Sequence, residues 1–155
     1  MWQELLIAGV IASIAALIAA FLSLGILGVA PDSLSPNYRW LYVGAALSAG
    51  LIGPLMWWLL YRRDLAAPTG RGIAAGMIAA LLCHPLVWAS ALLFSQAFGD
   101  GNFLWLGKDQ IHAYHPLALV GQFSLISLLY TGWITVIIGG VGGWFLEKLL
   151  SKRYL

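Results

Sequence analysis

The residue best placed for chemistry in this chain is a histidine inside a long apolar stretch. His84 lies near the middle of the segment 72–98, which contains no Asp, Glu, Lys or Arg, and Pro85 follows it directly. Proline removes a backbone donor and bends a helix locally, which opens room beside the histidine. An ionisable residue in such a segment is a candidate for function by default. His84 could therefore ligate a haem b iron, donate a hydrogen bond to a quinone or relay protons.

The structural alternative for His84 is a hydrogen bond to another helix. Thr131 and Tyr130 lie at a similar depth in the last apolar segment and are the expected partners. Interhelical polar bonds contribute about 0.6–2 kcal/mol in membranes. A six-coordinate haem needs a second axial ligand, and no other histidine lies within an apolar segment. The sequence favours the structural role and keeps His84, Thr131 and Tyr130 as ligand or proton-relay candidates.

The remaining two histidines lie in the polar segment 99–115. Asp109, His112 and His115 are spaced three residues apart, and on a helical turn they would share a face and could bind a divalent metal. Pro116 disfavours helical geometry at His115. The apolar residues 103–106 suit an interfacial helix, so the segment is more simply explained as a cap or a partner surface.

The elements that must position these residues are four apolar runs. They extend roughly over Leu5–Val29, Trp40–Tyr61, Gly72–Phe98 and Pro116–Leu146, and none contains a charged residue. At about 1.5 Å per residue, each is long enough to cross a hydrocarbon layer of about 30 Å. Charged residues make up 9% of the chain, against about 25% in soluble domains. The first run is too long for a signal peptide and lacks a basic start, so it is expected to be a transmembrane helix.

The fold class predicted is therefore an all-α integral membrane protein. We expect a single membrane domain over residues 1–155, built as an antiparallel, up-down bundle of four transmembrane helices. Kinks are expected near Pro54 and Pro85, because proline interrupts the helical hydrogen-bond ladder.

The basic residues predict how the bundle is oriented. With four spans, both termini and the middle loop share one side, which carries six basic residues against only Arg39 and Lys108 on the other. The positive-inside rule then places both termini in the cytoplasm and the loop 99–115 on the opposite side. The same six residues could hold anionic lipid headgroups, although topology alone explains them equally well. They are Arg62, Arg63, Arg71, Lys148, Lys152 and Arg153.

Small residues recur at helical spacing and predict close packing of the last two helices. Glycine and alanine at four-residue steps let a neighbouring backbone approach, and a serine–threonine stripe on the last helix should face protein. His84 is expected to be satisfied within that contact. The residues assigned to helix packing are Gly72, Gly76, Ala80, Ser127, Thr135 and Gly139.

The leading functional hypothesis from the sequence is association through these packing faces. The protein would be an accessory or scaffold subunit of a membrane complex, or a homo-oligomer, with the bilayer and other subunits or itself as partners. A small transporter or channel using His84 is one alternative, and a redox subunit holding haem or quinone is another.

Several classes are disfavoured by composition. The net charge of +2 does not argue for nucleic acid, and the single cysteine, Cys83, excludes an internal disulfide. No acid, base and nucleophile stand within reach of one another in the sequence, so no enzyme activity and no resident cofactor are predicted.

Overall fold

The structure, a computed structural model, describes residues 2–26, 39–61, 70–98 and 114–151, and these form four long helices. The helices are α1 (Trp2–Ile26), α2 (Arg39–Met56), α3 (Arg71–Phe98) and α5 (Pro116–Ser151), and a short π-helical segment, η3 (Trp57–Tyr61), continues α2. All four are long and apolar enough to cross a membrane. The prediction of an all-helical fold with four such segments is confirmed for the residues that the structure describes.

The helix ends differ from the apolar runs by a few residues. The largest difference is at the end of α5, which continues beyond Leu146 to Ser151 and includes Glu147 and Lys148. Leu, Glu and Lys are strong helix formers, and a cation in the last turn interacts favourably with the helix dipole. Apolarity marks where a chain can lie in hydrocarbon, whereas the helix itself ends later.

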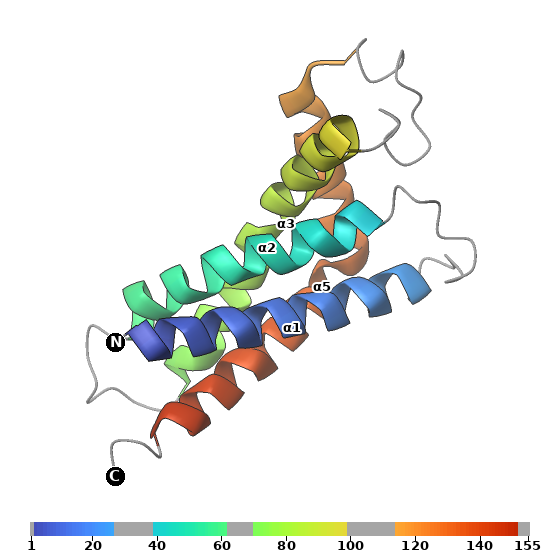
Figure 1. Ribbon diagram of the computed structural model, residues 1–155. Helices are drawn as coiled ribbons and strands as arrows, with labels where there is room; N and C mark the ends of the chain where they lie inside the picture. Colours follow the sequence, from blue (N-terminus) through green and yellow to red (C-terminus); the bar gives the residue numbers. More distant parts are fainter. Residues whose placement is uncertain (1, 27–38, 62–69, 99–113, 152–155) are drawn as a thin grey trace.

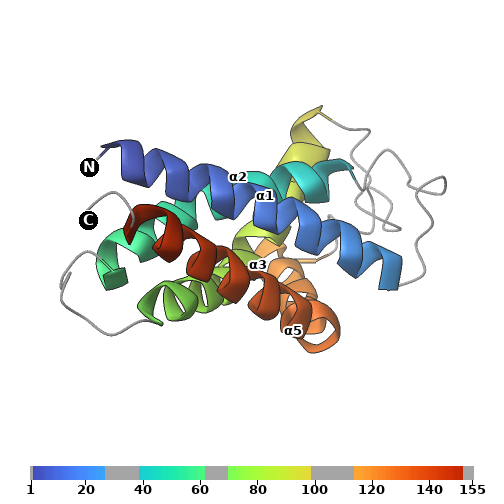
Figure 2. The ribbon, with the colours of Figure 1, turned by 90° about the horizontal axis from the view of Figure 1, so that it is seen from below.

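Consecutive helices run in opposite directions (Figures 1 and 2). α1 and α3 begin, and α2 and α5 end, at one end of the bundle. The extensive contacts join α1 to α2, α2 to α3, α3 to α5 and α5 back to α1, whereas the diagonal pairs touch little. The helices therefore surround a central axis, and that arrangement can leave an interior space.

A packed apolar cluster lies towards each end of the bundle. Near the start of α1, Ala8 packs with Trp57, Leu146 and Leu150. Near the other end, a second cluster joins α2, α3 and α5 without α1. Its members are Leu41, Ala91, Leu92, Leu119 and Phe123. At that end α3 and α5 turn away from α1, as Figure 1 shows.

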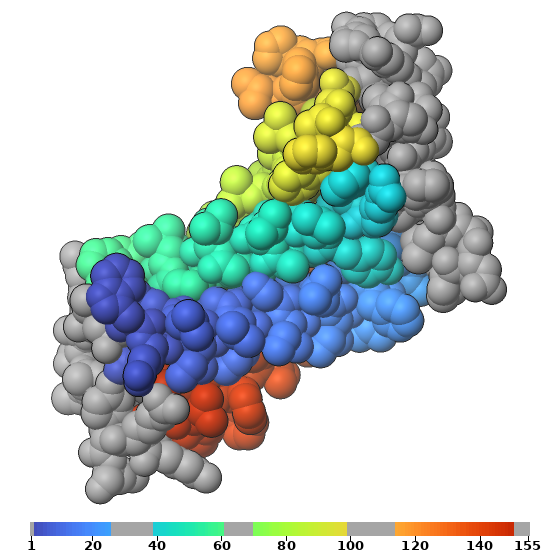
Figure 3. All heavy atoms as spheres, in the orientation of Figure 1, coloured from blue at the N-terminus to red at the C-terminus, as the bar shows by residue number. Residues whose placement is uncertain are grey.

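The outer surface of the bundle is apolar. α1 crosses the middle of the face seen in Figure 3, and large side chains such as Leu6, Val10 and Phe21 on this helix are exposed. Large contiguous apolar surfaces are rare on soluble monomers. This surface fits an integral membrane location.

The two intrahelical prolines have different surroundings. Pro54 lies near the end of α2, and the helix widens to π geometry over Trp57–Tyr61 directly afterwards. Proline cannot donate a backbone hydrogen bond, which is a known cause of such a local adjustment. Pro85, by contrast, lies inside α3, which continues as one helix from Arg71 to Phe98.

Candidate ligand cavity around His84

The contact between α3 and α5 positions His84. Gly76 and Gly139 face each other so closely that a Cβ added at Gly139 would lie 2.5 Å from the Gly76 carbonyl oxygen and 2.8 Å from the Ala80 Cβ. One turn away, a Cβ added at Gly72 would lie 2.5 Å from the Gly143 carbonyl oxygen. Only glycine permits this approach of two backbones. The structure thus brings the predicted packing residues of α3 and α5 together.

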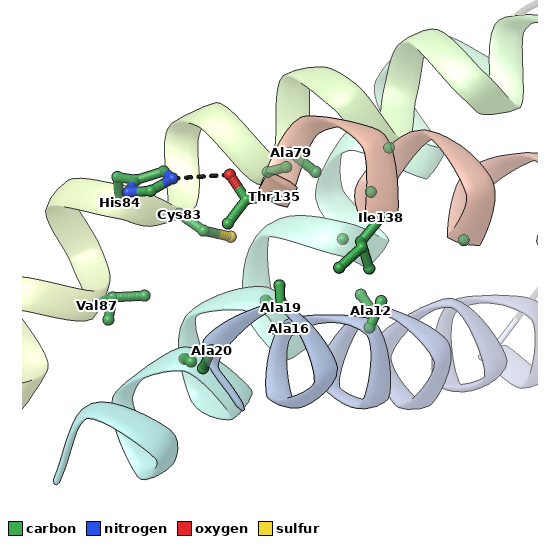
Figure 4. A pocket seen from close by; sticks show the side chains of 18 of the residues that line it. Ala12, Ala16, Ala19, Ala20, Ala79, Cys83, His84, Val87, Thr135 and Ile138 are labelled. Carbon is green, nitrogen blue, oxygen red and sulfur yellow. Dashed lines mark hydrogen bonds between the residues drawn. The ribbon is translucent and has the colours of Figure 1, made fainter. Parts of the chain in front are cut away.

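His84 is buried in this contact and bonded on both ring nitrogens. Its Nδ1 lies 2.8 Å from Ser127 Oγ, and its Nε2 lies 2.9 Å from Thr135 Oγ1. The Nε2 bond is drawn in Figure 4. The predicted interhelical role of His84 is therefore present in the structure, but with other partners than expected.

The prediction that His84 forms its hydrogen bond with Thr131 or Tyr130 is wrong. The Thr131 hydroxyl donates to the Ser127 carbonyl of its own helix at 2.9 Å, and the Tyr130 side chain is 64% exposed. The two ring nitrogens instead reach hydroxyls one turn to either side of Thr131. Depth along the helix predicted the region correctly, but it did not resolve which turn the ring would meet.

The hydroxyl groups that contact His84 also lie within hydrogen-bond distance of other groups. Ser127 Oγ accepts from Trp88 Nε1 at 2.9 Å and lies 3.0 Å from the Ser124 carbonyl, and Thr135 Oγ1 lies 2.8 Å from the Gly132 carbonyl. Each hydroxyl has one proton, which goes either to the imidazole or to its own helix. Neutral His84 donates to one hydroxyl and accepts from the other. No ring nitrogen is left to ligate iron, and the bonds end on backbone carbonyls, which do not pass protons onward.

A cavity of about 550 Å³ lies between the four helices beside His84. This volume is within the range of small-molecule sites, about 300–1,000 Å³. Figure 4 shows α1 presenting alanine side chains to it, with Cys83 and Ile138 directed into the same space from α3 and α5. The alanines of α1 that line it are Ala8, Ala12, Ala15, Ala16, Ala19 and Ala20. No Asp, Glu, Lys or Arg is among the lining residues, all of which belong to the described helices.

The lining residues of the cavity with the most exposed side chains belong to the first half of α5. Gly142, near the end of α5, packs on α1, since a Cβ there would lie 3.5 Å from the Ala15 Cβ. Towards the start of α5, Ile126 and Tyr130 line the cavity and are also 43% and 64% exposed. We call this exposed part of the wall, at Ile126 and Tyr130, the mouth of the cavity.

One buried hydroxyl in the cavity wall has no hydrogen-bond partner. Ser23, three residues before the end of α1, is 9% exposed, lines the cavity, and its Oγ is unpaired in the described structure. At the same end of the bundle, the buried Nε1 of Trp40 is also unpaired. Buried polar atoms are nearly always hydrogen-bonded, so each exception calls for a physical explanation.

The other predicted sites are described only in part. Asp109 and His112 of the predicted metal site lie outside the described residues, and the His115 side chain is exposed. The described residues contain no group of three or more metal-ligating side chains. Of the predicted lipid-binding residues, Arg71 begins α3 and Lys148 lies in the last turn of α5. Outside the described residues are Arg62, Arg63, Lys152 and Arg153.

Glu147 joins the two helix ends that carry Arg71 and Lys148. Its carboxylate accepts from the backbone N–H of Gly72 at 3.2 Å and from that of Gly70 at 3.4 Å. The first N–H groups of a helix lack intrahelical partners and favour a negative charge. Glu147 therefore caps α3 from α5, a contact the sequence did not predict.

No protein-family model, no curated protein and no solved structure matches this chain. By its fold and site, the part of the chain that the structure describes is a bundle of four helices, each long and apolar enough to span a membrane, with an apolar cavity between them.

Proposed function

We propose that this chain is an integral membrane protein that takes one apolar molecule from the bilayer into the cavity between its four helices. The observation that carries the proposal is the cavity of about 550 Å³ with its mouth at Ile126 and Tyr130. Wall atoms that face a void lack dispersion partners, so a guest that fills the space stabilises the bundle. Apolar cavities stay dry and accept apolar guests.

The same wall argues against an ion or proton pathway. Channels line their pores with carbonyls, charged rings or hydrogen-bonding groups. Here half of the lining residues are alanine or glycine, most of the others are apolar, and the hydroxyls of Ser127 and Thr135 are bonded to His84 or to their own helix. The transporter and quinone hypotheses from the sequence are compatible with this cavity only if the molecule that is transported or bound is itself apolar.

A pair of substitutions on one helix tests the proposal. Ala16 lines the cavity, whereas the neighbouring Leu17 is partly exposed on the other side and does not line it. Ala16→Phe should fill part of the space and reduce the apolar material that co-purifies with the protein, measured by solvent extraction and mass spectrometry. Leu17→Phe should retain it. Equal amounts from both variants would contradict the proposal, provided that circular dichroism shows both to be folded.

We further propose that both termini face the cytoplasm. The support is the six-to-two distribution of basic residues, of which Arg71 and Lys148 lie at the end where α1 begins and α5 ends. A cysteine at the last residue (Leu155→Cys, in a Cys83→Ser background) should react with an impermeant maleimide only after the membrane is opened. Labelling of intact cells would reverse the orientation.

Association with other membrane subunits, or with a second copy, is a second proposal. The facing glycines of α3 and α5 are occupied within the bundle, which removes the main motive for it. Gly25 and Gly121 remain, because a Cβ at either would meet nothing within 4 Å, and a partner helix could approach the backbone there. Blue-native electrophoresis after mild extraction should then show a larger species that Gly121→Ile disrupts. A monomer band for both proteins would exclude this proposal.

A further inference from the structure

The unpaired hydroxyl of Ser23 distinguishes one end of the cavity. Serines inside membrane helices commonly donate to a carbonyl of the preceding turn. Ser90, Ser95 and Ser124 do so here, at 2.6–2.8 Å from the carbonyl oxygens of Leu86, Leu92 and Val120. Ser23 makes no such bond, although it is as buried as the cavity wall around it. Its hydroxyl is therefore available to a guest.

The polar side chains in the middle of the cavity offer nothing comparable. His84 is hydrogen-bonded to both Ser127 and Thr135. The Thr131 hydroxyl is bonded to its own helix. A polar group on a guest would have to break one of these bonds to be recognised there. The middle of the cavity therefore accommodates apolar atoms, and a polar atom of the guest belongs near Ser23.

The length of the cavity wall along α1 suits one long chain. Its wall includes α1 from Ser23 back to Ala8, a distance of about 22 Å at about 1.5 Å per residue. Ser23 lies at the end where the mouth opens, and Ala8 lies in the packed cluster towards the other end. An amphiphile would place its polar head at the mouth and its tail along the alanine face of α1.

The wall also specifies the charge of the head. A charged group in an apolar site is costly unless it is paired. No Asp, Glu, Lys or Arg of the described helices lines the cavity. Among the described residues, the cation at that end is Arg39, whose guanidinium lies 4.7 Å from the centre of the Trp40 ring and does not line the cavity. A neutral head needs no counter-ion.

From these four observations we propose that the guest is a single-chain neutral amphiphile. It has one apolar chain that ends in an uncharged oxygen group, such as an alcohol or a carbonyl, and this group hydrogen-bonds to Ser23 Oγ. This inference rests on the proposed function and adds the class and orientation of the bound molecule.

The test uses the full chain in lipid nanodiscs, with Cys83 as the reporter. Cys83 is the single cysteine, and it lines the cavity. Octadecanol should slow the alkylation of Cys83 by N-ethylmaleimide at lower concentration than octadecane, stearate or octadecylammonium. Ser23→Ala should weaken the effect of octadecanol about fivefold, which corresponds to one net hydrogen bond. Ser95→Ala, a buried serine outside the cavity wall, should not change it.

The outcomes separate the two proposals. Protection by octadecane and octadecanol alike, unchanged in Ser23→Ala, would overturn the neutral-head inference and leave the apolar cavity in place. Stronger protection by stearate or octadecylammonium would overturn the neutral charge of the head. Failure of all four compounds to protect Cys83 would overturn both this inference and the proposed function.

Discussion

Adding one methyl group between α3 and α5 should destabilise the bundle, although the same change elsewhere should not. In Gly139→Ala, the new Cβ would lie 2.5 Å from the Gly76 carbonyl oxygen and 2.8 Å from the Ala80 Cβ. Non-bonded heavy atoms settle at about 3.5–4.0 Å, so the helices must separate by about 1 Å. Overpacking of this kind costs about 1–3 kcal/mol. The higher helix propensity of alanine offsets about 0.5–1 kcal/mol of this cost, which leaves a net loss of up to about 2.5 kcal/mol.

Gly121→Ala is the matched control on the same helix. A Cβ at Gly121 meets nothing within 4 Å, so only the gain in helix propensity remains. Reversible unfolding by SDS in mixed micelles, followed by tryptophan fluorescence, gives both free energies of unfolding. We expect Gly139→Ala to be the less stable by about 1–3 kcal/mol. If Gly139→Ala were as stable as Gly121→Ala, the glycine contact between α3 and α5 would not exist as described.

Three further results are expected from the same structure. His84→Ala removes both hydrogen bonds to α5. It should lower the free energy of unfolding by about 1–3 kcal/mol in mixed micelles. An unchanged free energy would mean that the ring is not bonded to α5. Glu147→Gln removes the negative charge at the start of α3 and should cost about 0.3–1 kcal/mol in the same assay, whereas a gain would contradict the cap. In nanodiscs, Cys83 should react with N-ethylmaleimide more slowly than an exposed cysteine, because an apolar wall disfavours the reactive thiolate, and it should resist a charged sulfonate thiol reagent. Rapid reaction with the charged reagent would show water in the cavity.

The helices were predictable because apolar length is a strong signal. Runs of more than twenty residues without charge predicted all four, and the small residues at Gly72, Gly76 and Gly139 predicted which two would pack most closely. The ends were less predictable. Glu147 and Lys148 lie inside α5 because a helix need not stop where the hydrocarbon stops.

The position of residues along the helices was not enough to predict the hydrogen-bond partners of His84. Positions along a helix predicted contact with the serine–threonine stripe of α5. They did not specify how the ring would turn, because rotation of each helix about its axis decides which hydroxyl faces it. A shift of one turn separates the expected Thr131 from the observed Ser127 and Thr135.

The cavity was the feature least visible in the sequence. The alanines of α1, including Ala12 and Ala16, are small enough to let a neighbouring helix approach closely. At one point this happens, since Gly53 of α2 faces Ala12 so closely that an added Cβ would lie 2.5 Å from the Ala12 Cβ. The same small side chains also line the cavity between the four helices. Small residues permit either contact or space, and only the arrangement of all four helices distinguishes the two.

Native mass spectrometry of the unmodified protein, released mildly from its own membrane, tests the central claim most directly. The account predicts one retained molecule per chain, of a mass that fits a neutral single-chain lipid and not a haem or a metal. The molecule should also be retained by Leu17→Phe and lost from Ala16→Phe. A bare chain under conditions that keep the protein folded, or a polypeptide partner as its sole companion, would contradict the account.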